Sequence, residues 1–286
     1  MFDEGLHPLG AQKRPPLHQQ LRLACAGYPK AWGLAQELIA DPLYTTMMET
    51  ANALAVNRMG YSDHGRTHAL VVAANAMAIF QAGLALGWEP TFGTKETRMR
   101  AASSRGARPP SSYPDSAVIV LLGSLLHDCG NAIVRERHWE QSVALAQPIL
   151  GRLLSRAYRS PLREKMILNI LEVIHSHDSA VPAYSLEGSI VKLADAMDCE
   201  GGRSRLPPAM QNPDQRYGAS SQAVDFVHLG PIAPGSPLPI WVELNDKAGL
   251  FQLEGIMAPR LDSGVLQKQV VLEAFIEGKK VWSHPK

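Results

Sequence analysis

Hydrophobic positions in the first two thirds of the chain recur with the spacing of amphipathic helices. This spacing predicts helices over residues 31–40, 42–58, 66–86, 116–127, 138–156, 161–175 and 186–199. The stretch 66–86 is rich in alanine, which suits close contact between helices. We therefore expect a helical domain over about residues 31–210.

Two segments lack the helical spacing. Residues 1–30 are polar and contain several prolines, which predicts a loose N-terminal arm. Residues 87–115 are rich in Gly, Pro, Ser and Arg and have no apolar period, so they predict a long loop inserted into the helical domain. The loop is basic, and a solvated loop is the more ordinary interpretation of such a charge run.

The pattern changes in residues 211–286. The runs AVDFVHL, PIWVELN and GLFQLEGI are short, rich in β-branched and aromatic residues, and separated by Pro and Gly, which predicts strands of a small sheet. The following SGVLQKQVVLEAFIEG fits either one helix or a short helix that enters a strand. The predicted fold class is mainly α, with a small C-terminal α+β appendage.

Composition gives no global signal for a charged partner. The chain has 28 Lys and Arg against 27 Asp and Glu, which favours neither nucleic acid nor an anionic membrane as a partner. Cys25, Cys129 and Cys199 lie far apart, so neither a disulfide framework nor a thiolate zinc site is indicated. With no leader-like segment or long apolar run, we expect a soluble cytoplasmic protein. The alanine-rich helical face leaves a homodimer open.

Acidic and imidazole side chains occur where the pattern predicts burial. LLGSLLHDCGN ends an apolar helix with His127 and Asp128, and IVKLADAMD places Asp195 among apolar positions. A buried carboxylate without a partner is destabilising or protonated, and a divalent cation is its simplest partner. His64 and His68, four residues apart, would each be read alone as solvent-side or capped histidines. Together, on different helices, these residues indicate mixed nitrogen and oxygen ligation, which is typical of Zn, Mn, Fe, Co or Ni.

The order of these residues resembles the HD-domain superfamily of metal-dependent phosphohydrolases. The resemblance covers about residues 60–200 and is carried by HALVVAANA, LLHDCGN and VKLADAMD. It implies an HD-type helical domain whose first metal ligands are His68, His127, Asp128 and Asp195. RERHWEQS and VIHSHD resemble the two-metal branch, which adds His138 and His175 as ligands of a second ion and makes Asp128 a bridge between the two.

The resemblance also assigns supporting residues. His64, His177 and Asp178 would stand next to the ligands, and the cofactor would be one or two divalent transition-metal ions. Lys192 lies three residues before Asp195, and we take it, with Asp128, as a candidate catalytic residue.

A possible phosphate contact follows the last predicted ligand. GGRSRLP supplies Arg203 and Arg205, whose guanidinium groups suit bidentate contact with phosphate. A solvated basic turn is an equally good interpretation of these residues alone. Their position close to a metal ligand favours a small phosphorylated substrate.

The predicted function is therefore hydrolysis of a phosphomonoester or phosphodiester, with a nucleotide among the candidate substrates, by a metal-activated water. Two alternatives remain open. The superfamily also contains di-iron oxygenases with the same kind of ligand set, and a non-catalytic nucleotide sensor would use the helical domain to bind and the C-terminal segment to transmit a signal.

Overall fold

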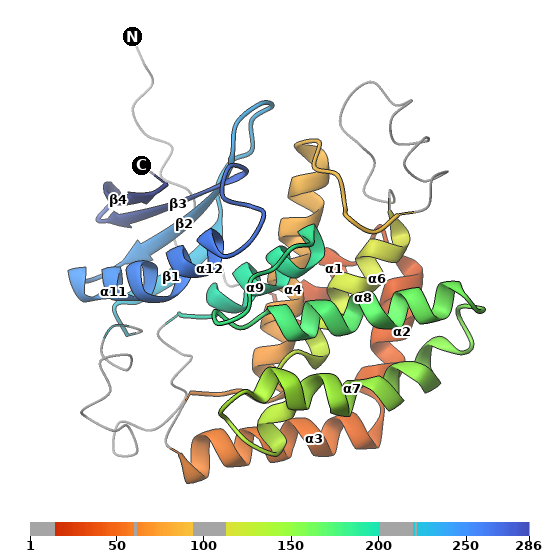
Figure 1. Ribbon diagram of the computed structural model, residues 1–286. Coiled ribbons are helices and arrows are strands. Elements are labelled where there is room, and N and C mark those ends of the chain that lie inside the picture. The colour runs from red at the N-terminus through yellow and green to blue at the C-terminus, as the bar shows by residue number, and fades with distance from the viewer. Residues whose placement is uncertain (1–14, 60–61, 94–112, 201–219, 221, 286) are drawn as a thin grey trace.

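The computed structural model describes residues 15–59, 62–93, 113–200, 220 and 222–285 (Figure 1). Arg203 and Arg205 lie outside these residues. The helices of the N-terminal part are α1 Leu17–Ala24, α2 Pro29–Ile39, α3 Pro42–Asn52, α4 Arg66–Ala85, α6 Pro114–Leu126, α7 His138–Leu154, α8 Leu162–Ser176 and α9 Leu186–Ala196. A π-helical turn, Ala53–Arg58, prolongs α3, and a 3₁₀ turn, Cys129–Ala132, follows α6.

The predicted helices between residues 31 and 199 are all present, and local signals explain where several begin. Proline occupies the first turn of α2, α3 and α6, a position where its missing N–H costs no hydrogen bond. The Asp41 carboxylate accepts from Leu43 N at the start of α3, and the Ser185 hydroxyl accepts from Gly188 N at the start of α9. The fold is thus mainly α, as predicted.

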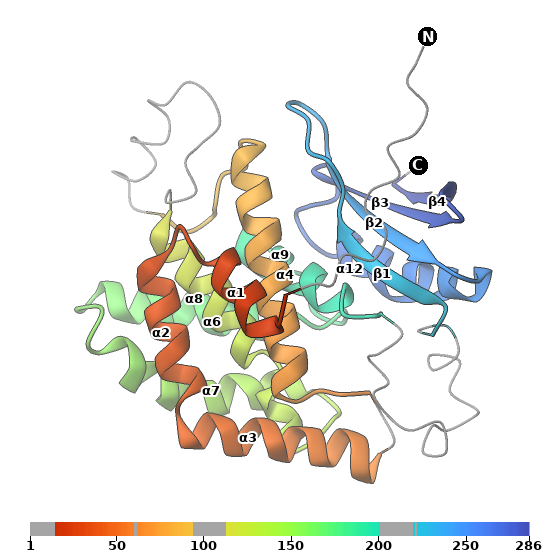
Figure 2. The ribbon, with the colours of Figure 1, turned by 180° about the vertical axis from the view of Figure 1, so that it is seen from behind.

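The expectation of a loose N-terminal arm is wrong for residues 17–30. Helix α1 packs against α4, and Leu21, Cys25 and Tyr28 are buried in the core (Figure 2). The Gln81 amide on α4 donates to the carbonyl of Ala24. Successive buried positions are four and three residues apart, which is the spacing of one face of a helix. The prolines on either side made this pattern hard to recognise in the sequence.

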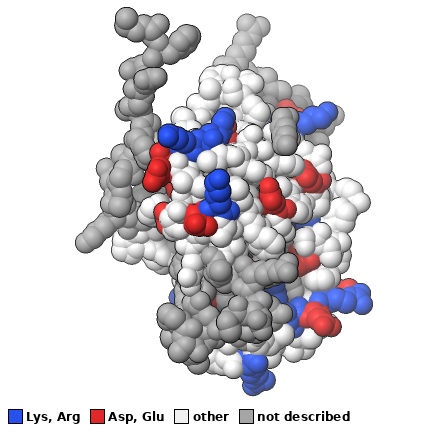
Figure 3. All heavy atoms as spheres, turned by 90° about the vertical axis from the view of Figure 1, so that its left-hand side faces the viewer, with Lys and Arg blue, Asp and Glu red and all other residues white. Residues whose placement is uncertain are grey.

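The C-terminal unit is a four-stranded sheet with helices on one face. Its strands, in the order β1-β2-β3-β4, are Val224–Leu229, Leu238–Leu244, Val270–Ile276 and Lys279–His284. The β2 and β3 strands are parallel, and the other two pairs are antiparallel. Along β2 buried and half-buried residues alternate, so one face of the sheet packs inwards. Acidic and basic side chains are interspersed on the side of the molecule that carries this unit (Figure 3).

The third predicted strand, GLFQLEGI, is helical. Helix α11 Leu250–Gln252, a π-helical turn Leu253–Met257 and α12 Ala258–Asp262 run in succession and connect the parallel strands β2 and β3. Two parallel strands require such a crossover connection. The composition of a short apolar run does not distinguish a buried helix from a strand. Leu253, Met257 and Leu261 are buried with a spacing of four, the helical signature of the packed face.

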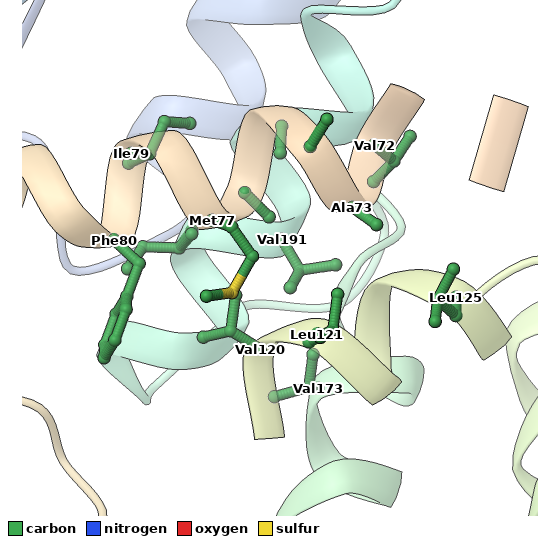
Figure 4. Packing of buried hydrophobic residues seen from close by; sticks show 14 of the residues in the cluster. Val72, Ala73, Met77, Ile79, Phe80, Val120, Leu121, Leu125, Val173 and Val191 are labelled. Carbon is green, nitrogen blue, oxygen red and sulfur yellow. The ribbon is translucent and has the colours of Figure 1, made fainter. Parts of the chain in front are cut away.

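The core of the helical domain is centred on α6, whose residues from Ser116 to Leu126 are all buried. Helices α4, α8 and α9 surround it, and Val120 and Leu121 meet Met77 of α4, Val173 of α8 and Val191 of α9 (Figure 4). Among the described helices only α4 is long and apolar enough to cross a membrane, and most of its apolar stretch is buried in the protein. Its apolarity is therefore that of a core helix.

We expect Gly123→Ala to destabilise the protein, because a Cβ at Gly123 would lie 2.5 Å from Cγ1 of Val173 and would force α6 and α8 apart. Overpacking of this kind costs about 1 to 3 kcal/mol of the free energy of unfolding. Urea denaturation in the presence of a chelator measures the change without a contribution from bound metal. The matched control is Gly151→Ala in α7, where a Cβ meets nothing within 4 Å and a gain of about 0.5 to 1 kcal/mol is expected. Equal stability of both variants would contradict the close packing of α6 on α8.

Candidate metal centre

Five helices, α4, α6, α7, α8 and α9, bring imidazole and carboxylate side chains to one buried point. The residues are His64, His68, His127, Asp128, His138, His177, Asp195 and Asp198, and all of them are buried. Side chains of these types are buried in proteins only when they are paired, hydrogen-bonded or bound to a metal.

A first group of donor atoms lies between α4, α6 and α9. The Nε2 atom of His68 is 3.2 Å from Nε2 of His127 and 3.2 Å from Oδ1 of Asp195. Asp128 Oδ2 lies 3.4 Å from His68 Nε2 and 3.5 Å from His127 Nε2. His127 Nε2 and Asp195 Oδ1 are 4.0 Å apart. Two imidazole nitrogens and two carboxylate oxygens thus face one another.

A second group of donor atoms uses the other oxygen of the same carboxylate. Asp128 Oδ1 lies 3.0 Å from Nε2 of His138 and 3.5 Å from Nε2 of His177. The two imidazole nitrogens are 3.1 Å apart. Asp128 therefore connects the two groups, with Oδ2 in the first and Oδ1 in the second.

The separations within both groups fit a metal ion. An ion about 2.0 to 2.2 Å from each of its tetrahedrally placed ligands would hold those ligand atoms about 3.3 to 3.6 Å apart. The observed separations scatter around this range. Paired Nε2 atoms that both point a lone pair at the other would repel at such distances, and a cation between them removes the repulsion. The buried His and Asp groups are therefore positioned to bind metal.

Backbone carbonyls orient three of the five imidazoles. Nδ1–H of His127 donates to the Ser124 carbonyl at 2.7 Å, and Nδ1–H of His177 donates to the Ile174 carbonyl at 2.6 Å. Nδ1–H of His138 donates in the same way to the carbonyl three residues before it, at 3.1 Å. Because a neutral imidazole carries one proton, each of these bonds leaves Nε2 as an acceptor that faces the centre. This is the arrangement that ligating histidines adopt.

Carboxylates hold the remaining imidazoles. Nδ1–H of His68 donates to Oδ2 of Asp198 at 2.6 Å, which turns Nε2 of His68 towards the first group. Nδ1–H of His64 donates to Oδ2 of Asp128 at 2.8 Å. His64 therefore lies beside a candidate ligand, and together with His68 and Asp128 it also forms a group that could hold a metal ion.

Electrostatics keep the donor atoms deprotonated, as metal binding requires. Burial lowers the pKa of His127 to about 4, although Asp128 acts in the opposite direction. For Asp128, burial alone raises the pKa, but the surrounding imidazoles, led by His127, hold the pKa well below its usual value. For Asp195, burial again raises the pKa, and the Arg260 guanidinium is the largest of the influences that outweigh it.

A close backbone contact brings Asp128 to His138. The 3₁₀ turn after α6 folds the chain back onto the first turns of α7, where Gly130 N donates to the Ser142 hydroxyl at 2.8 Å. A Cβ at Gly130 would lie 2.0 Å from the carbonyl oxygen of His138, so only glycine fits there. The nine residues between the two donors are thus a compact turn.

The structure reverses the roles expected for His175 and His177. His177 is buried and contributes Nε2 to the second group, whereas His175 is half-buried and belongs to none of the donor groups among the described residues. Residues two apart on a helix point about 200° away from each other, so only one of the two can face the centre. The buried positions Met166, Ile170 and Val173 continue to His177 with helical spacing. This apolar stripe is the signal in the sequence that identifies the inward histidine.

Lys192 and Asp178 lie away from the donor atoms. The Lys192 ammonium donates to the carbonyl of Val181 at 2.6 Å and to the hydroxyl of Ser263 at 2.9 Å, so it joins α9 to the C-terminal unit rather than facing the metal ligands. Its burial lowers its pKa to about 8. The Asp178 carboxylate accepts from Ala180 N in a turn after α8.

Two residues of the centre were not among the predicted site residues. Asp198 closes the helix that carries Asp195, and its spacing of three from that residue was a usable signal. Arg260 belongs to α12, and its Nη2 lies 3.1 Å from Oδ2 of Asp195. Nothing in the local sequence around Arg260 indicates this long-range contact.

Comparison with known proteins gives one informative relative. The chain is 31% identical over 256 residues to the uncharacterized protein MJ1020 of Methanocaldococcus jannaschii, and the match covers 89% of this chain and 92% of that protein. No profile of a known protein family matches the chain, and no solved structure matches it.

We expect His177→Ala to reduce the amount of bound metal and His175→Ala to leave it unchanged. The two residues are matched in type and lie on the same helix end, but only His177 Nε2 faces Asp128. Elemental analysis of protein saturated with metal and then desalted should give a lower content for His177→Ala than for wild type, because the second donor group loses one of its two imidazoles. Equal metal contents in the two variants would contradict the assignment of the second donor group.

Proposed function

The chain belongs to the same family as protein MJ1020, and from the arrangement of its buried donor atoms we propose that it is a metal-dependent phosphohydrolase of the HD type. Its substrate would be a phosphomonoester or phosphodiester, with nucleotides as the first compounds to test. The observation that carries the proposal is the shared carboxylate: Asp128 offers one oxygen to each of two groups of imidazole nitrogens.

The order of the donors along the helices supports an HD-type centre. The first histidine stands near the start of α4, the His-Asp pair ends α6, and the last aspartate lies on α9. His138 and His177 add the second donor group from α7 and α8. This is the order by which the sequence resembles the two-metal branch of the superfamily.

Metal ions bound in such a pair of sites lower the pKa of a water molecule and polarise a phosphoryl oxygen. The chain's own residues prepare the site for this chemistry. The carbonyls of Ser124 and Ile174 hold the imidazoles of His127 and His177 in the tautomer whose Nε2 is free to bind. Burial of all donors in a medium of low polarity strengthens their interaction with charge.

A positive side chain next to the centre supports an anionic substrate. Arg260 lies on the side of Asp195 that faces the C-terminal unit, with its Nη2 3.1 Å from Oδ2 of that carboxylate. A cation on one side of a buried site attracts phosphate groups.

The donor set also suits iron, which keeps an oxygenase as the second candidate. Imidazoles and carboxylates are ligands of Fe and also of Mn, Zn, Co and Ni, so ligand chemistry alone does not separate the two reactions. The dependence on oxygen separates them. A hydrolase turns over equally with and without O₂, and an oxygenase does not.

We expect the protein, loaded in turn with each of these metals, to release phosphate from at least one ester in a screen of nucleotides, phosphomonoesters and phosphodiesters. Asp128→Ala should abolish both turnover and metal retention, because no neighbouring residue can supply oxygens to both donor groups. The loss of ions that contribute several kcal/mol corresponds to a fall of about 10³-fold or more in rate. His175→Ala, outside the donor groups, is the control and should keep both properties.

Three results would argue against the proposal. Full activity of Asp128→Ala with stoichiometric metal would remove the metal centre from the reaction. Turnover that requires O₂ would identify an oxygenase. Tight binding of a nucleotide without hydrolysis in any metal would identify a sensor.

A further inference from the structure

The C-terminal unit reaches the metal centre through two polar contacts between α9 and α12. Lys192 and Asp195 lie three residues apart on α9 and meet Ser263 and Arg260, which lie three residues apart at α12. Asp195 uses its two oxygens for different partners. Oδ1 faces His68 Nε2 at 3.2 Å, and Oδ2 faces Nη2 of Arg260 at 3.1 Å.

The backbone that carries Arg260 is held in place from several sides. Ser263 accepts from Lys192 through its hydroxyl and from Ala183 N through its carbonyl. Val265 N donates to the Ser189 hydroxyl one further turn back along α9. The end of α12 is therefore fixed against α9, and the guanidinium stands at a defined position beside Asp195.

The Arg260 guanidinium has an N–H donor that is not used in a hydrogen bond among the described residues. Its Nε is buried and has no hydrogen-bond partner in the part of the chain that the structure describes. A buried donor without an acceptor costs free energy, so such a group in a native protein calls for an explanation, and a ligand that supplies the acceptor is one. The Arg260 side chain is 15% exposed, against 5% for Asp195, so it lies nearer to the surface than that carboxylate.

We propose that Arg260 is a phosphate-binding residue of this centre. One Nη2–H would stay on Asp195 while Nε–H and a remaining Nη–H donate to oxygens of the substrate's phosphoryl group. A planar guanidinium with donors in a fixed fork suits the oxygens of a phosphate better than any other side chain. This inference rests on the proposed hydrolysis of a phosphate ester. It makes the C-terminal unit part of the catalytic site, because Arg260 belongs to α12 of that unit.

A competing role for Arg260 is to position Asp195 alone. In that case its removal would disturb the carboxylate and weaken metal binding, and phosphate affinity would fall only as a consequence. Metal content and phosphate affinity, measured on the same samples, separate the two roles.

The test measures the binding of inorganic phosphate by calorimetry to metal-loaded wild type, Arg260→Gln, Arg260→Lys and Lys280→Gln. Lys280 is the control, because it is a cation of the same unit, paired with Glu273 on the sheet. Arg260→Gln should weaken phosphate binding by about 10- to 150-fold, the loss expected for a charge-assisted hydrogen bond. Arg260→Lys, which keeps the charge but not the fork, should lie between that variant and wild type. Metal content of all four metal-loaded proteins should be unchanged, because a bound cation itself keeps the Asp195 carboxylate ionised when Arg260 is replaced. The phosphate affinity of Lys280→Gln should also be unchanged.

Unchanged phosphate affinity in both Arg260 variants would overturn the inference, and so would loss of metal in parallel with loss of phosphate. Arg260→Lys preserves most of the packing, so it decides the question if Arg260→Gln fails to fold. The proposed function is judged separately, by whether the wild-type protein hydrolyses any ester. If it hydrolyses none, the hydrolase proposal fails even where Arg260 binds phosphate. If it hydrolyses an ester with KM unchanged in Arg260→Lys and Arg260→Gln, only the role of Arg260 fails.

Discussion

The buried carboxylate of Asp128 is the constraint around which the helical domain is arranged. An ionised carboxylate in the interior costs several kcal/mol unless charge and hydrogen bonds compensate it. Here five imidazoles lie within hydrogen-bonding or ligand distance of its two oxygens, and they come from α4, α6, α7 and α8 and from the residues at their ends. The helices must therefore meet at this point. Their packing on α6 depends on the contacts of the Asp128 carboxylate as well as on the apolar core.

Most of the donors lie at helix ends, and this placement has a physical use. The last carbonyls of a helix have no partner within the helix. In α6 and α8 the carbonyls of Ser124 and Ile174 accept Nδ1–H of His127 and His177, each three residues further on. One contact thus satisfies a backbone acceptor and orients an imidazole with Nε2 towards the centre. His68, which lies in the first turn of α4, donates its Nδ1–H to a carboxylate instead, Oδ2 of Asp198.

The sequence predicted those parts of the centre that a single helix encodes. His127, Asp128 and Asp195 stand out because each interrupts or ends an apolar run, and the structure brings them together. The choice between His175 and His177 failed because His175 was taken to complete the apolar helix, whereas the buried stripe that begins at Met166 continues to His177. Arg260 could not be predicted, since the packing of α12 on α9 depends on the whole crossover between β2 and β3. The same crossover turned a predicted strand into a helix, because tertiary packing outweighs weak local preference.

Helix α9 shows why the C-terminal unit and the helical domain act as one body. Every residue of α9 is buried, a pattern that a helix at the edge of a bundle does not have. Helices α4, α6 and α8 cover one side, and α12 covers another. The apolar core is accordingly continuous from the helical domain into the sheet, from Val120 and Val191 to Leu261 and Ile240. Asp195 therefore takes its position from both sides, with His68 on one oxygen and Arg260 on the other. Because α12 is packed against α9 in this way, a movement of the C-terminal unit relative to α9 would displace the Asp195 carboxylate, which is a candidate metal ligand.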